Sequence, residues 1–167
     1  MLGEKAAVEI TWYGQTCVRL HERNVTILTD PYDNSVGLTL PRLRADIVTF
    51  SHVPAPNKSG IKRVQGEPRI LTGPGEYEVK EVFIVGIASW QRARKNEEEQ
   101  PARNTIFLFD VDNLTICHLG RLGKALTQAQ LEALGAVDVL LVPIGGRETL
   151  DASGAAEVIS SLEPAIV

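Results

Sequence analysis

Short apolar runs separated by turn residues fill the chain as far as residue 118. The runs are rich in β-branched residues, and Gly, Pro, Asn or Asp stands between them, a pattern typical of β-strands joined by turns. Because little helical sequence separates these runs, we expect mainly antiparallel sheet here. The predicted strands are Val8–Trp12, Cys17–Leu20, Val25–Asp30, Ile47–Phe50, Arg69–Leu71, Tyr77–Val79, Val82–Ile87, Thr105–Asp110 and Leu114–His118.

Residue patterns that predict helices occur only after residue 118. Thr127 and Gln130 have the spacing of a capping box, which predicts a helix that begins at Thr127. Asp151 is suited to cap a second helix that ends near Ser161. One face of this second helix is apolar, formed by Ala155, Val158, Ile159 and Leu162.

Buried strands are predicted on either side of the second helix, at Val137–Val142 and from Ala165 to Val167. Strands followed by helices that alternate with strands indicate sheets with helices packed outside them. The 167 residues are most simply one α/β or α+β domain, 1–167.

Ala88–Asn104 differs in composition from the rest of the chain. Three cations are followed by three glutamates, in the sequence ASWQRARKNEEEQPARN. Such a run buries too little apolar surface to order itself, which favours a solvated hairpin loop. A short RNA- or partner-binding arm is the alternative, although the glutamates weaken it.

The overall composition is that of an ordinary globular protein. The apolar fraction is 44%, the formal net charge is −4 and the pI is about 5.4, so no global field favours nucleic acid or an anionic membrane. The first residues are too polar for a signal peptide and no apolar run has membrane-spanning length, which predicts a cytoplasmic protein. Cys17 and Cys117 stand within apolar runs. We expect buried free thiols, with a disulfide left open.

Ala45–Gly60, ADIVTFSHVPAPNKSG, combines a buried strand with a proline-rich loop that begins at Ser51-His52. This stretch resembles the metal-binding strand and loop of metallo-β-lactamase-fold hydrolases, which reads His-x-His-x-Asp-His. In the same register His52 matches the first histidine. Pro54, Pro56 and Asn57 stand where the second histidine, the aspartate and the last histidine would be.

Four further stretches resemble the same family, in the family's order. They are ITWYGQTCVRL (Ile10–Leu20), ILTDPYD (Ile27–Asp33), LTGPGEYEV (Leu71–Val79) and ICHLGRLG (Ile116–Gly123). The last resembles a segment that reads His-Leu-Gly-Asp-Leu-Gly in active members. The resemblance implies a four-layer αββα sandwich with the site along one edge of the paired sheets.

The resemblance also implies which metal ligands are absent. Active members bind zinc or manganese through histidine and aspartate, and here His52 and His118 alone match ligand positions. Gln15 replaces a histidine of close relatives, and the final ligand histidine of relatives would lie just beyond Val167. Arg121 stands where relatives carry a metal-bridging aspartate, and a guanidinium has no lone pair to offer. At ~4 Å from a divalent ion, the repulsion between the guanidinium and the metal would amount to several kcal/mol.

We therefore expect a vestigial cleft with no metal and no catalytic residue. Its polar residues either satisfy one another, with Arg121 paired to Asp30 or Glu76, or bind a small polar or anionic ligand through Arg121 and His118. The full set is Gln15, Asp30, His52, Asn57, Glu76, His118 and Arg121.

The function favoured by these residues is a non-catalytic binding or assembly module. The alternative is a zinc- or manganese-dependent hydrolase whose site is sparse, or is completed by a partner chain or by residues absent here. Neither Cys117-His118 nor Ser51-His52 is expected to form a nucleophile–base pair, because neighbours in a strand point to opposite faces. Gly145-Gly146-Arg147 could cradle an anion, although Gly-Gly is more often a turn.

The last residues predict an oligomer. A strand that starts at Ile166-Val167 would leave part of a sheet edge uncovered, and uncovered edges pair with other chains. We expect a homo-oligomer.

Overall fold

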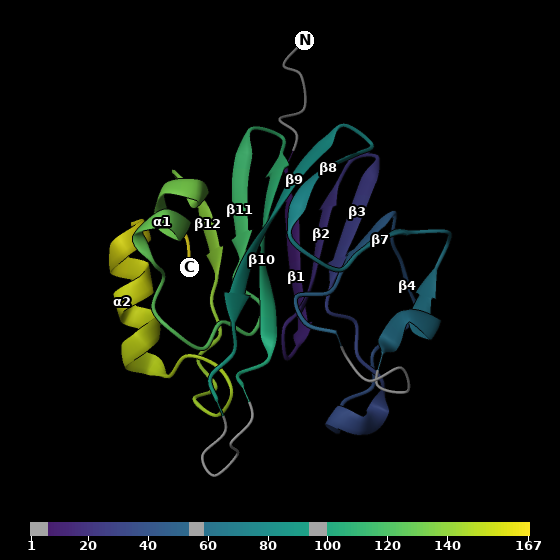
Figure 1. The fold of residues 1–167 in the computed structure, drawn as a ribbon. Helices are drawn as coiled ribbons and strands as arrows, with labels where there is room; N and C mark the ends of the chain where they lie inside the picture. Colours follow the sequence, from purple (N-terminus) through teal and green to yellow (C-terminus); the bar gives the residue numbers. More distant parts are fainter. Residues whose placement is uncertain (1–6, 54–58, 94–99) are drawn as a thin grey trace.

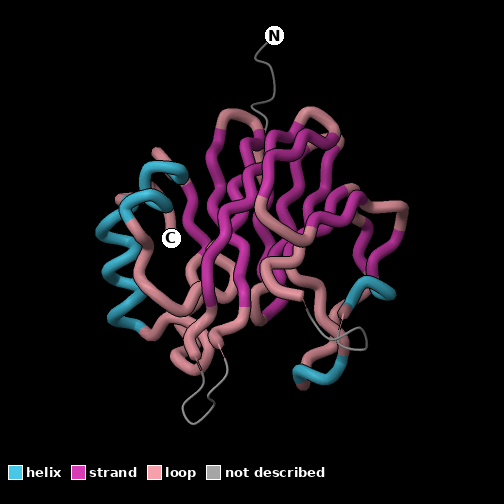
Figure 2. The backbone as a smooth tube through the Cα atoms, in the orientation of Figure 1, coloured by secondary structure: helices cyan, strands magenta, loops and turns pink. Residues whose placement is uncertain are grey.

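Two five-stranded sheets stacked face to face form the body of the protein (Figure 1). The structure is a computed structural model that describes residues 7–53, 59–93 and 100–167. Figure 2 shows the strands in the middle of the molecule, the two α-helices on one outer side and short 3-10 turns on the other. Neither α-helix in the described part of the chain is long and apolar enough to cross a membrane.

The first sheet has the strand order β1-β2-β3-β5-β7. Its first three strands are antiparallel, whereas β3, β5 and β7 run parallel to one another. The expectation of mainly antiparallel pairing is therefore wrong for this half of the sheet. Long connections follow β3 and β5, and a connection of a dozen residues or more allows the chain to return in the same direction. The strands are β1 (Glu9–Gly14), β2 (Cys17–Glu22), β3 (Val25–Thr29), β5 (Ile47–Thr49) and β7 (Arg69–Leu71).

The second sheet has the order β12-β11-β10-β9-β8. It is antiparallel except for β11 and β12, which are parallel and are joined through helix α1 (Gln128–Leu134). Its strands are β8 (Gly75–Val79), β9 (Val82–Trp90), β10 (Arg103–Val111), β11 (Leu114–His118) and β12 (Val139–Leu141).

Both helix caps occur as predicted. The Thr127 side chain accepts from the backbone N–H of Gln130, and the Gln130 side chain accepts from the backbone N–H of Thr127, which completes the capping box. Asp151 caps α2 (Ala152–Leu162) by accepting from the N–H of Gly154 at 2.9 Å. These two local signals fix where each helix starts.

Period-two alternation divides the apolar residues between three cores. Ile27 and Ile47 face the space between the sheets, where they meet Phe107 and Phe109 of the second sheet. A second core packs α1 and α2 against the outer face of the second sheet. The third core lies on the outer face of the first sheet, and its members include Cys17, Leu28, Leu40, Val48 and Phe50.

The predicted sandwich is confirmed, with one difference in its outermost layer. Within the described ranges, no α-helix covers the first sheet. Its outer face instead carries the short parallel pair β4 (Leu43–Arg44) and β6 (Val64–Gln65) with the 3-10 helices η1 (Asn34–Val36) and η3 (Gly60–Arg63).

The hairpin between β9 and β10 is longer than predicted. Trp90 pairs with Arg103 at its end, and the Arg103 guanidinium lies 5.9 Å from the centre of the Trp90 ring. Both ends of the predicted Ala88–Asn104 loop are therefore strand, because cross-strand side-chain contacts continue past the apolar run. Residues 94–99, which hold most of the charged run, lie outside the described residues.

The two cysteines are free and buried, as expected. Cys17 lies in the core outside the first sheet and Cys117 in the core beneath the helices, so the two sheets separate them. Burial raises the pKa of each thiol to about 12, and the charge of Asp30 adds to the shift at Cys17. Both thiols are thus kept neutral and unreactive.

Candidate functional site

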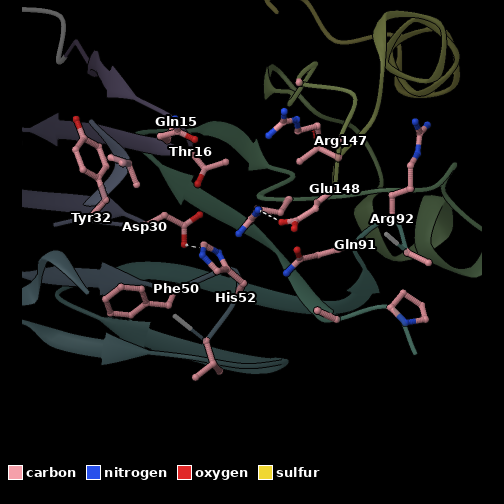
Figure 3. A pocket seen from close by; sticks show the side chains of 18 of the residues that line it. Gln15, Thr16, Asp30, Tyr32, Phe50, His52, Gln91, Arg92, Arg147 and Glu148 are labelled. Carbon is pink, nitrogen blue, oxygen red and sulfur yellow. Dashed lines mark hydrogen bonds and ion pairs between the residues drawn. The ribbon is translucent and has the colours of Figure 1, made fainter. Parts of the chain in front are cut away.

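A cleft of about 800 Å³ opens where the loops of the two sheets meet. The first sheet contributes the residues that follow β3 and β5, and the second sheet contributes those that follow β9 and β11. The loop before α2 completes the lining. Figure 3 shows Asp30, Tyr32 and Phe50 on one side, with Arg92, Arg147 and Glu148 on the other. Ends of strands from both sheets therefore position one shared site.

Asp30 directly follows β3 in a left-handed backbone conformation, with φ 40°, and is 4% exposed. Both of its carboxylate oxygens accept from Ser51. The Ser51 backbone N–H donates to Oδ1 at 2.7 Å, and the Ser51 hydroxyl donates to Oδ2 at 2.6 Å. A buried carboxylate is costly unless hydrogen-bonded, and Ser51 supplies that stabilisation. Asp30 thus ties the end of β3 to the loop after β5.

His52 lies beside this pair. Its Nδ1 is 3.3 Å from the Ser51 hydroxyl and 3.8 Å from Asp30 Oδ1. The prediction that Ser51 and His52 point apart is wrong, because β5 ends at Thr49 and the alternation of a strand no longer applies beyond it. Ser51 is 2% exposed and donates to Asp30, so it is not placed as a free nucleophile.

The His52 pKa is lowered from its usual value. Burial is the largest cause, and the charges of Arg121 and His118 lower it further, while Asp30 and Glu148 raise it. The neutral imidazole is therefore favoured, and Arg121 acts electrostatically on this ring.

His118 ends β11 and points between the sheets, whereas Cys117 packs beneath the helices, as the alternation predicted. The imidazole is 2% exposed and its Nε2 lies 3.0 Å from the carbonyl oxygen of Thr16. Nε2–H donates to that carbonyl, while Nδ1 is buried without a hydrogen-bond partner in the described part of the chain. Burial lowers the His118 pKa, with Asp30 and the Thr16 bond opposing the shift.

These shifts predict an acid-sensitive fold. Histidine in the unfolded chain takes up a proton near its usual pKa of 6.5, whereas native His118 resists protonation. Below that pH the unfolded state binds more protons, so the free energy of unfolding falls with decreasing pH by up to about 1.4 kcal/mol per pH unit for each such histidine. The loss continues until the lowered native pKa is reached.

Urea denaturation between about pH 7.5 and about pH 5.5 measures this slope. His118→Gln should flatten it, with a residual slope from His52. His21→Gln, outside the cleft, is the control for replacing one histidine by glutamine. An equal slope in wild type and His118→Gln would contradict the assignment.

Arg121 lines the cleft but pairs with Glu148, through its Nη2 and the Glu148 Oε2. The predicted partners, Asp30 and Glu76, are both wrong. Asp30 already accepts two hydrogen bonds from Ser51, and Glu76 lies exposed on β8, outside the cleft lining. The Asn104 side chain holds the Arg121 backbone in place. Its Oδ1 accepts a hydrogen bond from the Arg121 backbone N–H at 2.8 Å.

Two charged cleft residues, Arg92 and Glu148, escaped the sequence reasoning, and Arg147 was considered only as part of a possible anion cradle at Gly145-Gly146-Arg147. Arg92 donates to the carbonyl of Gly146 at 3.3 Å and to Asp151 at 3.2 Å. Arg147 is exposed, and no ion pair involves it among the described residues. The Gly145-Gly146 turn next to Arg147 was the available signal, and it gave no indication that this loop faces β9 and β11.

Of the remaining predicted residues, Gln15 lines the cleft beside Thr16. Its φ of 52° marks the tight turn between β1 and β2. Asn57 lies outside the described residues, together with Pro54 and Pro56. The structure thus brings five of the seven predicted residues to one region, namely Gln15, Asp30, His52, His118 and Arg121.

The described residues do not fit a metal ion. Within ranges 7–53, 59–93 and 100–167, no three His, Cys, Asp or Glu side chains are grouped so that they could hold one. The Asp30 carboxylate already accepts a hydrogen bond from the Ser51 hydroxyl, and the Arg121 charge lowers the pKa of His52. The unpartnered Nδ1 of His118 has a free lone pair, but one nitrogen is too few for a zinc site of three or four ligands.

A sequence model of a family described as the beta-lactamase superfamily domain matches residues 9–167. A UPF0173 metal-dependent hydrolase of Thermoplasma acidophilum is 28% identical over 189 residues, which is 95% of this chain and 80% of that protein. A UPF0173 protein of Pyrococcus furiosus is also 28% identical, with the same coverage of both chains.

Two solved structures are similar over nearly the whole chain. One, from Thermotoga maritima, is provisionally described as a Zn-dependent hydrolase of the metallo-beta-lactamase superfamily. It is 36% identical, with a TM-score of 0.78, over 95% of this chain and 72% of that one. The other is from Parabacteroides distasonis, with 16% identity and a TM-score of 0.71 over 94% of this chain and 79% of that one, and it supports the fold alone.

Proposed function

Because the chain belongs to the beta-lactamase superfamily domain family, yet its described residues do not fit a metal ion, we propose that it binds a small anionic molecule in the cleft without hydrolysing it. The observation that carries the proposal is the convergence of Arg92, Arg121 and Arg147 on one cleft. Arginine recognises phosphate and carboxylate groups through paired hydrogen bonds.

The charges of the cleft indicate where an anion would bind. Arg121 is paired with Glu148 and Arg92 with Asp151, so Arg147 offers the cation that no described acid neutralises. Gln91 and Gln100 add amide donors to the lining. Asp30 on the opposite side would repel an anion, which supports binding of the proposed anionic group towards Arg147.

The opposite side of the cleft carries apolar side chains as well as Asp30. Tyr32 and Phe50 line it, and Val53 is 82% exposed beside them. A ligand with a phosphate or carboxylate group and an apolar body would contact both sides. Phenyl phosphate is a simple probe with this combination of groups.

Titration calorimetry with phenyl phosphate tests the proposal at low ionic strength, where screening is small. Arg147→Gln should weaken binding by about tenfold or more, because a charge-assisted contact is lost. Arg42→Gln removes an exposed cation outside the cleft and matches the change in net charge, and it should change affinity less than about twofold. Binding that is absent, or equal in both variants, would overturn the proposal.

The competing function is metal-dependent hydrolysis, which the names of the relatives from Thermoplasma acidophilum and Thermotoga maritima favour. Elemental analysis of protein produced with added zinc and manganese separates the two. We expect well under one metal per chain and no hydrolysis of phosphodiester or ester substrates. About one metal per chain, lost together with activity on His52→Ala, would establish the hydrolase instead. The two free thiols support a reducing compartment such as the cytoplasm as the site of action.

A further inference from the structure

The cleft contains an arginine whose anion-binding position is already filled by a carboxylate of the same chain. Three arginines line the cleft, and two of them are paired with acids. Arg121 pairs with Glu148, and Arg92 pairs with Asp151 at 3.2 Å. Among the described residues, this leaves Arg147 as the one arginine of the lining without a paired acid. The arginines therefore compensate the charge of one anionic group of a ligand, and no more.

The ion pair of Arg121 with Glu148 lies inside the cleft. The Arg121 side chain is 31% exposed and the Glu148 side chain 20%. Both charges reach the His52 ring, because Arg121 lowers the His52 pKa and Glu148 raises it. In Figure 3 the Glu148 side chain points into the cleft. A ligand in the cleft would meet this ion pair directly.

Backbone contacts hold Glu148 in this position. The N–H of Arg92 donates to the carbonyl of Glu148 at 2.8 Å, and the Arg92 guanidinium donates to the carbonyl of Gly146 at 3.3 Å. On the other side, the N–H of Leu150 donates to the carbonyl of Leu122 at 2.8 Å. The loop is thus attached on both sides of Glu148. A group positioned in advance loses little conformational entropy when it makes its contact, which favours a persistent ion pair.

Glu148 affects an incoming anion in two ways. Its carboxylate accepts from Arg121 Nη2, which is the kind of donor that a phosphate or carboxylate of a ligand would use. Its negative charge also opposes a second anionic group at the same place, since like charges brought together weaken binding. Specificity can arise from such an unfavourable contact as well as from favourable ones.

We propose that Glu148 restricts the cleft to ligands with a single anionic group by occupying the anion-binding position at Arg121. This role rests on the anion binding proposed for the cleft, but a different residue carries it: Arg147 attracts the anionic group, and Glu148 excludes a second one. The class of ligand is then a monophosphate or monocarboxylate with an apolar body. Bisphosphates, dicarboxylates and phosphorylated carboxylates would be excluded.

Titration calorimetry with two probes at low ionic strength tests the proposal, because screening is small there. Phenyl phosphate has one anionic group, and 2-carboxyphenyl phosphate adds a carboxylate beside the phosphate. Wild type should bind phenyl phosphate at least about fivefold more tightly than 2-carboxyphenyl phosphate, because the added carboxylate meets Glu148.

Glu148→Gln keeps an acceptor oxygen for Arg121 and removes the negative charge. It should bind 2-carboxyphenyl phosphate more tightly than phenyl phosphate, which changes the ratio of the two dissociation constants by about tenfold or more. Arg121→Gln in the Glu148→Gln background should abolish this reversal, because the exposed cation is lost. Glu76→Gln is the matched control, since Glu76 is exposed on β8 outside the cleft lining, and it should leave the ratio within about twofold of wild type.

The outcomes separate the role of Glu148 from anion binding itself. Suppose that wild type binds phenyl phosphate and Arg147→Gln weakens this binding. An unchanged probe ratio in Glu148→Gln, or a wild type that binds both probes equally, would then overturn the role of Glu148 alone. A reversal that persists without Arg121 would also overturn it. Binding of neither probe to wild type or to Glu148→Gln would overturn both proposals. Circular dichroism of each variant checks that the fold is intact.

Discussion

Replacing Gly123 by alanine is expected to lower the free energy of unfolding by about 3 kcal/mol or more, the upper range for overpacking, because the obstacle is backbone. An added Cβ at Gly123 would lie 1.8 Å from the backbone nitrogen of Arg92 and 2.3 Å from the carbonyl carbon of Gln91. Gly123 also donates its N–H to the carbonyl of Trp90 at 2.9 Å. The loop after β11 therefore presses directly on the chain that leaves β9.

The Gly123→Ala substitution should also disturb the cleft, because Gln91 and Arg92 line it. Urea denaturation followed by circular dichroism measures the stability change. Gly73→Ala is the matched control, since nothing lies within 4 Å of the added Cβ there. Equal stability losses in the two variants would contradict the close contact.

Replacing Asp30 by alanine is expected to cost about 3 kcal/mol, since it leaves the buried N–H and hydroxyl of Ser51 without their acceptor. Alanine also suits the left-handed backbone at φ 40° poorly. Asp30→Asn should cost less, because asparagine tolerates that conformation and keeps one acceptor oxygen. Asp110→Ala, at an exposed position on β10, is the control for losing one carboxylate.

The same variant tests the electrostatics of the cleft. The Asp30 charge raises the His52 pKa against the effect of burial, so Asp30→Asn should lower that pKa further. Titration of the His52 ring by NMR measures the shift. A His52 pKa that rises in Asp30→Asn would show that the carboxylate does not act on this ring as the structure indicates.

Most strands and both helices follow from local sequence. Period-two alternation located the strands to within a few residues at each end, as for Leu114–His118, and the caps at Thr127 and Asp151 fixed the helix starts. Local sequence did not indicate whether neighbouring strands run parallel or antiparallel. The parallel pairing of β5 with β3 and β7 depends on how the long connections cross the outer face of the first sheet.

The sequence by itself determined the family, and it named the side chains that stand where the resemblance expects metal ligands, because a motif in fixed register names each side chain. Only the tertiary structure decided what those side chains contact. Arg121 meets Glu148 and not Asp30, since Ser51 comes from another strand end to satisfy Asp30. The hollow lined by Ile10 of β1 and Leu141 of β12 likewise forms only because these two strands, far apart in the chain, lie side by side in the folded protein. Contacts of this kind are set by packing between distant segments, which no local pattern encodes.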